Sequence, residues 1–147
     1  MILISTSFQN NGPIPAKFTC QGEDISPDLV ISSIPQNAKS LALIVDDPDS
    51  PGGDFVHWIM WNIPATTNTI ASNTTPSGAI VGKNSALGNK YMGPCPGTGN
   101  HRYVFHLSAL DTTLNLPENV SRADLEKEIA QHKIDSCELI GTYQKSN

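Results

Sequence analysis

A chain of 147 residues with a net charge of −5 is long enough for one domain with a buried core, which we expect to cover residues 1–147. Its few lysines and arginines form no cluster, which argues against nucleic acid or an anionic membrane surface as the principal partner. No apolar run is long enough for stable membrane insertion, and the first residues do not resemble a secretory signal, so we expect a cytoplasmic protein.

Short apolar runs separated by 11 glycines and 11 prolines predict a β-rich domain. The clearest strand covers residues 40–47, where Leu41, Leu43 and Val45 face one way and Ala42 faces the other. Because both faces are apolar, this strand is expected at the centre of a sheet that is covered on both sides.

Two further predicted strands, at residues 56–63 and 101–110, each place a histidine at the open end of an otherwise apolar face. Between them, residues 64–100 are rich in polar residues and glycine and predict turns, short edge strands and a long ordered loop. By alternation, the expected faces are His57, Ile59 and Trp61 in the first strand, and His101, Tyr103, Phe105 and Leu107 in the second.

One segment breaks the β pattern and predicts a helix over residues 122–132. Ser121 can cap the first free amides of this helix, with Asp124 three residues further on. Leu125 and Ile129 then form a narrow apolar stripe, as in a helix that packs on a sheet through one face. We expect the helix at the edge of the β-sandwich, followed by a last strand in the segment CELIGTY.

The cysteine pattern predicts reduced thiols. Cys20, Cys95 and Cys137 are odd in number, far apart and in no CxxC pair. This favours packing residues over a disulfide framework or a zinc site. We accordingly expect no metal and no cofactor.

The richest group of functional side chains is in DDPDSPGGDFVHW, residues 46–58. Asp47 and Asp49 follow the buried strand where prolines end regular pairing, and carboxylates this close usually need a cationic partner or a metal. His57 begins the next strand, and His101 begins another one directly after a loop rich in glycine and proline. These groups can converge at one end of the sandwich.

An anion pocket is the chemistry that these groups support best. Two imidazoles and the Tyr103 hydroxyl can hold an anion, and glycine amides of the loop can approach it closely. The aspartates are expected to accept the second ring N–H of each histidine and to raise the imidazole pKa, which favours the charged form. The amides belong to Gly93, Gly97 and Gly99, whereas Pro94 and Pro96 would hold the loop in shape without donating amides.

Three enzymatic interpretations stay open beside the pocket. Ser50 with His57 and an aspartate has the composition of a hydrolase triad, but these residues are in no nucleophile-elbow motif. Cys95 can be a nucleophile, although no base of fixed geometry is evident. The main alternative is a metal-assisted or acid/base hydrolase, even though no HxH or HExxH spacing is present. Its residues would be His57, His101 and Asp47 or Asp49.

Five ordered motifs resemble those of the phosphatidylethanolamine-binding proteins, and most closely the bacterial and archaeal branch called Raf kinase inhibitor-like proteins. The motifs are IPAKFTCQGEDISPDL, KSLALIVDDPDSP, FVHWIMWNIP, KYMGPCPGTGNHRYVFHLSALD and IGTYQ. The resemblance covers nearly the whole chain. It implies a mainly β fold, an antiparallel Greek-key β-sandwich in which a large sheet packs on a smaller one, with one or two short helices.

The resemblance also implies a pocket for phosphate, acetate or a phospholipid head group at one end of the sandwich. Its ligand-binding residues, carried over by motif, are Asp47, Asp49, His57, Gly93, Pro94, His101 and Tyr103. We therefore predict a non-enzymatic binding protein that recognises a phosphorylated group and acts as an inhibitor or modulator of a protein kinase or protease. Bacterial relatives suggest a homodimer, for which an apolar patch on the final strands is expected. The loop GKNSALG departs from the GRNDFG-like loop of bacterial members.

Overall fold

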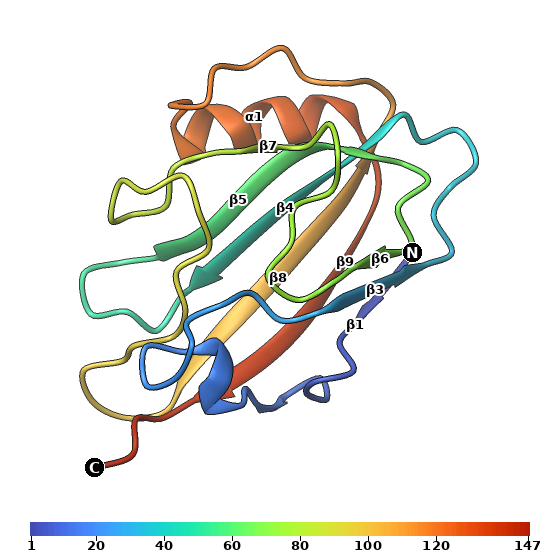
Figure 1. Cartoon of the computed structure of the whole chain (residues 1–147). Coiled ribbons are helices and arrows are strands. Elements are labelled where there is room, and N and C mark those ends of the chain that lie inside the picture. Colours follow the sequence, from blue (N-terminus) through green and yellow to red (C-terminus); the bar gives the residue numbers. More distant parts are fainter.

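In a computed structural model, all residues from 1 to 147 are described, and they form two β-sheets, one α-helix and one short 3₁₀ helix (Figure 1). The elements are β1 (Ile2–Ile4), β2 (Gly12–Pro13), η1 (Ala16–Phe18), β3 (Leu29–Ser32), β4 (Ser40–Asp47), β5 (Phe55–Pro64), β6 (Thr69–Ile70), β7 (Ile80–Val81), β8 (His101–Leu110), α1 (Arg122–His132) and β9 (Lys133–Tyr143). The helix has the predicted bounds, and the predicted strands are all present. The last strand is longer than expected and begins directly after α1.

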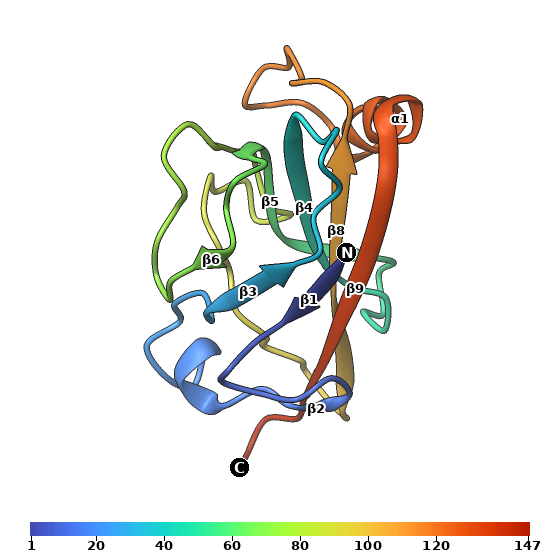
Figure 2. The same ribbon diagram turned by 90° about the vertical axis from the view of Figure 1, so that its right-hand side faces the viewer.

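The two sheets pack face to face as the layers of a sandwich (Figure 2). The large sheet has the order β2-β9-β8-β4-β5-β7, and the small sheet has the order β1-β3-β6. All strand pairs are antiparallel except β2 with β9, which is parallel. The main core lies between the sheets and contains Leu41, Leu43 and Val45 on the inner face of β4. The mainly β fold with a large and a small sheet is thus confirmed.

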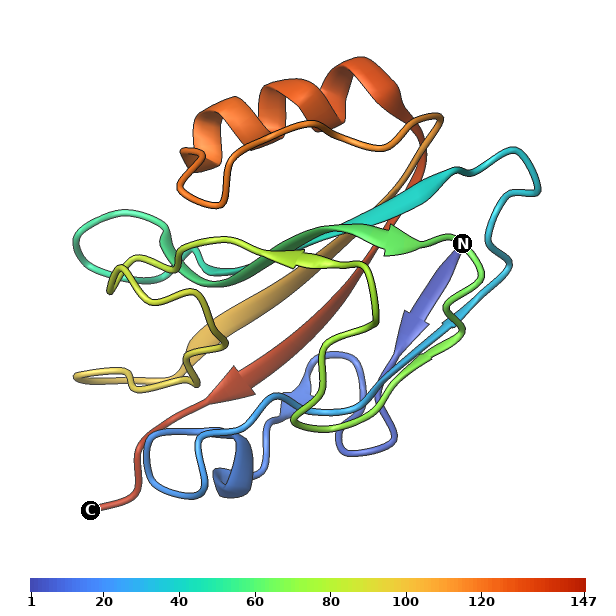
Figure 3. The same ribbon diagram turned by 45° about the horizontal axis from the view of Figure 1, so that its top comes forward.

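The helix α1 covers the outer face of the large sheet, opposite the small sheet (Figure 3). Leu125 and Ile129 of α1 pack there in a second apolar cluster with Ala42, Ile44 and Trp61. The prediction of a helix at the sandwich edge was therefore wrong, because the outer face of β4 is apolar and needs a cover. No helix of the chain is both long and apolar enough to cross a bilayer.

A β-bulge at the start of β5 changes the direction of His57. Val45 of β4 pairs with Trp58, but the next residue, Asp46, pairs with Val56, so His57 has no partner on β4. The alternation that would place His57 with Ile59 on the outer face is broken at this point. The prediction of that shared face was wrong, and the imidazole instead lies beside the ring of Tyr103, which belongs to the inner core.

Candidate functional site

A cavity of about 180 Å³ opens at the end of the sandwich where β4 ends and β5 and β8 begin. Four of the predicted site residues line it, namely Asp47, His57, His101 and Tyr103. The rest of its wall consists of Ser50, Pro51, Phe55, Met92, Cys95, Pro96 and Gly97. The structure therefore brings together both histidines, the tyrosine and one aspartate from three different strands.

His57 is held in one tautomer. Its Nδ1 lies 2.6 Å from the carbonyl oxygen of Met92 and must carry the proton of this hydrogen bond. Burial lowers the pKa of His57, although the Met92 carbonyl and nearby carboxylates oppose this shift. The ring is consequently neutral near pH 7, and Nε2 is left without a partner in the chain. The expectation that a carboxylate accepts the second N–H and raises the pKa was wrong for this histidine, because a backbone carbonyl takes that place.

His101 has the carboxylate contact that was expected. Its Nδ1 lies 2.7 Å from Oδ2 of Asp47, and its Nε2 lies 3.0 Å from the carbonyl oxygen of Thr98. Both contacts are hydrogen bonds at the same time only when both ring nitrogens carry a proton. The other carboxylate oxygen of Asp47 accepts a hydrogen bond of 2.8 Å from the backbone N–H of Asp49. This arrangement orients the imidazole at the cavity wall.

Tyr103 lines the cavity and has a buried hydroxyl without a hydrogen-bond partner in the chain. Its ring lies nearly perpendicular to the His57 ring at a centroid distance of 5.1 Å, and only 1% of the residue is exposed. The hydroxyl oxygen is buried and makes no hydrogen bond in the chain. Burial, with the charges of Asp47 and Asp49, raises the pKa of Tyr103, so the group stays an O–H donor.

Three neighbouring aspartates each have a separate cationic partner, so they do not form one acidic cluster. Asp47 contacts His101, whereas Asp49 accepts hydrogen bonds from the backbone N–H and the guanidinium of Arg102. The Arg102 hydrogen bonds lower the pKa of Asp49 to about 2. Asp49 is thus hydrogen-bonded to the start of β8 through Arg102, and it does not line the cavity.

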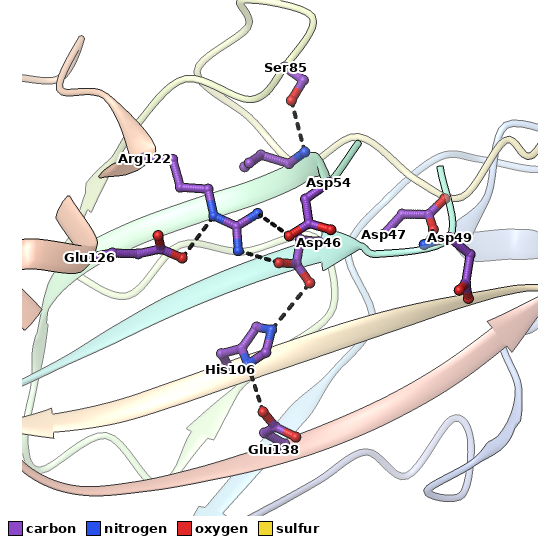
Figure 4. Close-up of polar contacts among 10 residues, drawn as sticks. Asp46, Asp47, Asp49, Asp54, Ser85, His106, Arg122, Glu126 and Glu138 are labelled. Atoms are coloured by element: carbon purple, nitrogen blue, oxygen red, sulfur yellow. Dashed lines mark hydrogen bonds and ion pairs between the residues drawn. The ribbon is translucent and has the colours of Figure 1, made fainter. Parts of the chain in front are cut away.

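Asp46 points to the opposite side of β4, away from Asp47 and Asp49 (Figure 4). It is 3% exposed and forms ion pairs with Arg122 of α1 and with His106 of β8. Asp46 therefore does more than solvate the end of the strand. Alternation along β4 sends consecutive aspartates to opposite faces, and the outer one ties the helix to the sheet.

We expect the ion pairs of His106 to make folding stability depend on pH. The Asp46 hydrogen bond, opposed by burial, raises the pKa of His106. In the unfolded chain this histidine has a pKa of about 6.5, and below that pH the stabilisation from the raised pKa is fully present. The stabilisation is lost as the pH rises through the pKa of the folded state. The imidazole is 37% exposed, so the loss should be less than about 1 kcal/mol. This loss is measured by urea unfolding of the wild type and of His106→Gln between pH 5.5 and 8.5. A wild-type curve parallel to that of the variant would contradict the expectation.

Sequence and structure comparisons agree on the family. The sequence pattern described as "Phosphatidylethanolamine-binding protein" matches residues 4–144. A UPF0098 protein of Pyrococcus horikoshii is 47% identical over 150 residues, which cover 97% of this chain and 76% of the relative. The chain belongs to the phosphatidylethanolamine-binding protein family.

Two solved members of the phosphatidylethanolamine-binding protein family have nearly the same fold. A homologue from Chlamydia trachomatis superposes with a TM-score of 0.94 at 40% sequence identity. The match covers 98% of this chain and 97% of the homologue's chain. YbcL of Escherichia coli, whose structure is described as a member of the mammalian family, gives a TM-score of 0.91 at 29% identity and 98% coverage of both chains. These relatives support the assignment of this chain to the bacterial and archaeal branch of the family.

Gly93 and Pro94, which the family motif suggested as ligand-binding residues, do not line the cavity. The backbone N–H of Gly93 donates to Asp24 at 2.7 Å, and the carbonyl of Pro94 accepts from Cys20 N–H at 3.1 Å. A Cβ atom on Gly93 would come within 2.4 Å of an Asp24 carboxylate oxygen and of the Phe18 carbonyl. Both residues therefore join the loop to the segment after η1, and the cavity is lined by Cys95, Pro96 and Gly97 instead.

Cys20 and Cys95 form a disulfide, which corrects the prediction of three reduced cysteines. The two residues are 75 positions apart, and only the packing of the loop against the segment after η1 brings their Cα atoms to 5.5 Å. Cys137 alone is free. The disulfide also occupies the thiol that was considered as a nucleophile.

Backbone carbonyls are the site groups that sequence reasoning missed. Those of Met92 and Thr98 orient His57 and His101, and no side-chain pattern marks a carbonyl as an acceptor. Phe55, at 4.9 Å between ring centroids from His57, was also missed, although it lies two residues away in the same motif. The chain has no group of three or more His, Cys, Asp and Glu side chains placed to hold a metal ion.

Proposed function

We propose that this family member is a non-enzymatic binding protein whose cavity holds a small anion, such as phosphate, a carboxylate or the phosphorylated group of a larger molecule. The unpartnered Tyr103 hydroxyl is the observation that carries the proposal, because it is a buried, unsatisfied group of a residue that lines the cavity. Buried hydroxyls almost always have a partner in native proteins. A ligand oxygen would supply the missing one.

The groups around the hydroxyl suit an anion. His101 presents a ring that forms both of its hydrogen bonds only as a cation, and Gly97 brings backbone to the cavity with no side chain in the way. The relatives' family name refers to phosphatidylethanolamine, whose head group contains a phosphate. The cavity of about 180 Å³ suits a head group or a single phosphate better than a lipid chain.

Replacement of Tyr103 by phenylalanine tests the proposal. We expect Tyr103→Phe to weaken phosphate binding about tenfold or more, because a hydrogen bond to a charged ligand contributes about 1.5–3 kcal/mol. The unfolding free energy of the empty protein should stay the same or rise, because the variant loses an unsatisfied buried group. Isothermal titration calorimetry with phosphate and urea unfolding measure the two effects.

Tyr143→Phe is the matched control. The Tyr143 hydroxyl donates to the side chain of Gln21 outside the cavity, so its removal should lower stability by about 1 kcal/mol and leave phosphate affinity unchanged. Equal phosphate affinity in Tyr103→Phe and the wild type would contradict the proposal. Metal-dependent turnover of a phosphate ester by the wild type would favour the hydrolase alternative instead.

The partner, the oligomeric state and the location remain predictions. A protein kinase or protease that carries a phosphorylated residue is the proposed target, and a homodimer is the proposed assembly. The exposed large apolar side chains are Ile2 and Ile4 of β1 and Leu87, and none of them belongs to the final strands, where the apolar patch was expected. The Cys20–Cys95 disulfide weighs against a cytoplasmic location, because such bonds persist mainly in oxidising compartments.

A further inference from the structure

The cavity contains no permanent positive charge. No lysine or arginine lines it, and the guanidinium of Arg102 is bound to Asp49 through contacts of 3.0 and 2.9 Å. Asp47, by contrast, adds a carboxylate to the wall. An anion that enters this cavity therefore meets a negative group and at most one cation, the imidazolium of His101. A doubly charged anion needs a further proton to be held there.

His57 offers a hydrogen-bond acceptor where an anion would need a donor. The contact of 2.6 Å with the Met92 carbonyl fixes the proton on Nδ1, so Nε2 of the neutral ring has only a lone pair. Burial lowers the pKa of His57 and keeps the ring neutral. A fully deprotonated ligand oxygen and this lone pair repel each other, and one proton between them converts the repulsion into a hydrogen bond.

The other titratable groups around His57 do not supply this proton. They are Asp46 and Asp47 of β4, Asp24 of the loop after η1, and His101 and Tyr103 of β8. The carboxylates are acceptors, and His101 directs one ring nitrogen to Asp47 and the other to Thr98. The Tyr103 O–H can donate one hydrogen bond to the ligand, but it brings no positive charge.

We infer that the cavity takes up its anion together with one proton, which lies between His57 Nε2 and a ligand oxygen. The preferred ligands are therefore anions of weak acids that can carry this proton, above all phosphomonoesters. This inference rests on the proposed anion-binding function and names the ligand class of the same site. The proton comes from the ligand itself when the ligand is a monoanion, and from the solvent when it is a dianion.

The inference predicts a specific pH dependence. A phosphomonoester has a second pKa of about 6, so below this pH it brings its own proton and the affinity is constant. Above this pH each bound ligand takes one proton from the buffer, and the affinity falls tenfold for each pH unit. Sulfate has the same tetrahedral shape and charge at pH 7.5 but cannot carry the proton, so its binding requires protonation of buried His57 itself.

Calorimetry with methyl phosphate and with sulfate tests the inference. Titrations in two buffers of different ionisation enthalpy count the protons taken up. We expect about one proton per methyl phosphate at pH 7.5, about none at pH 5, and sulfate affinity at least tenfold weaker at pH 7.5. His57→Gln keeps a side chain that can donate to the Met92 carbonyl but does not titrate, so the uptake at pH 7.5 should disappear. His132→Gln, at a surface histidine bound to Asp111, should retain it.

The outcomes separate this inference from the proposed function. Methyl phosphate binding without proton uptake at pH 7.5, or with equal sulfate affinity, overturns the inference and leaves the anion site intact. Uptake that persists in a folded His57→Gln protein shows that the proton does not depend on His57 and also overturns the inference. Failure of both anions to bind at any pH removes the proposed function. If His57→Gln does not fold, the number of protons taken up by the wild type and its preference for methyl phosphate over sulfate still test the inference.

Discussion

Removal of the Cys20–Cys95 disulfide should lower the free energy of unfolding by about 4 kcal/mol. The bond closes a loop with a sequence separation of 75 residues, which contains β3 to β7 and therefore much of both sheets. Closure of so long a loop restricts the unfolded chain strongly, and the variant regains that conformational freedom. Urea unfolding of the double variant Cys20→Ser/Cys95→Ser measures the loss.

Two controls show whether the loss of stability comes from the loss of the disulfide. The wild type treated with a thiol reductant should unfold at the same urea concentration as the double variant, since both lack the bond. Cys137→Ser removes the free, half-buried thiol and should cost about 1 kcal/mol or less. A difference below about 1 kcal/mol between wild type and double variant would mean that the disulfide does not restrict the unfolded chain.

Replacement of Arg122 by methionine should cost about 2–3 kcal/mol of stability, the second largest expected effect. Arg122 joins α1 to the sheet through Asp46, and it also contacts Glu126 at 2.8 Å and Asp54 at 3.7 Å (Figure 4). The Asp46 side chain is only 4% exposed, so the variant leaves a buried carboxylate with His106 as its one remaining cation. The expected cost lies below that of a fully buried pair, because the arginine is 24% exposed.

Arg102→Met is the matched control for Arg122→Met. Arg102 also pairs with an aspartate, here through two guanidinium nitrogens, but its side chain is 56% exposed, so its loss should cost about 1 kcal/mol or less. Asp46→Asn combined with Arg122→Met should recover part of the stability, because the unpaired charge is removed. Equal losses for the two arginine variants in urea unfolding would show that burial of Asp46 is not the cause.

Local patterns in the sequence predict the long strands and the helix of this protein, but not the short strands β1, β2 and β3. Alternation of apolar residues predicts β4 and β8, and the Ser121 cap with the stripe of Leu125 and Ile129 predicts α1 at its observed bounds. These signals are readable because each depends on neighbours within one turn or one strand. The ordered motifs likewise indicate the family, and with it the end of the sandwich where the cavity lies.

Tertiary packing alone decided the details that matter for chemistry. The bulge that turns His57 inward depends on the register between β4 and β5, and the carbonyl that sets its tautomer belongs to Met92, 35 residues away. The separate partners of Asp46 and Asp49 and the disulfide partner of Cys20 come from segments that are still further away in the sequence. A sequence shows which groups are present and how neighbours alternate. Charge pairing, tautomers and disulfides depend on distances across the fold, and only the packed chain sets them.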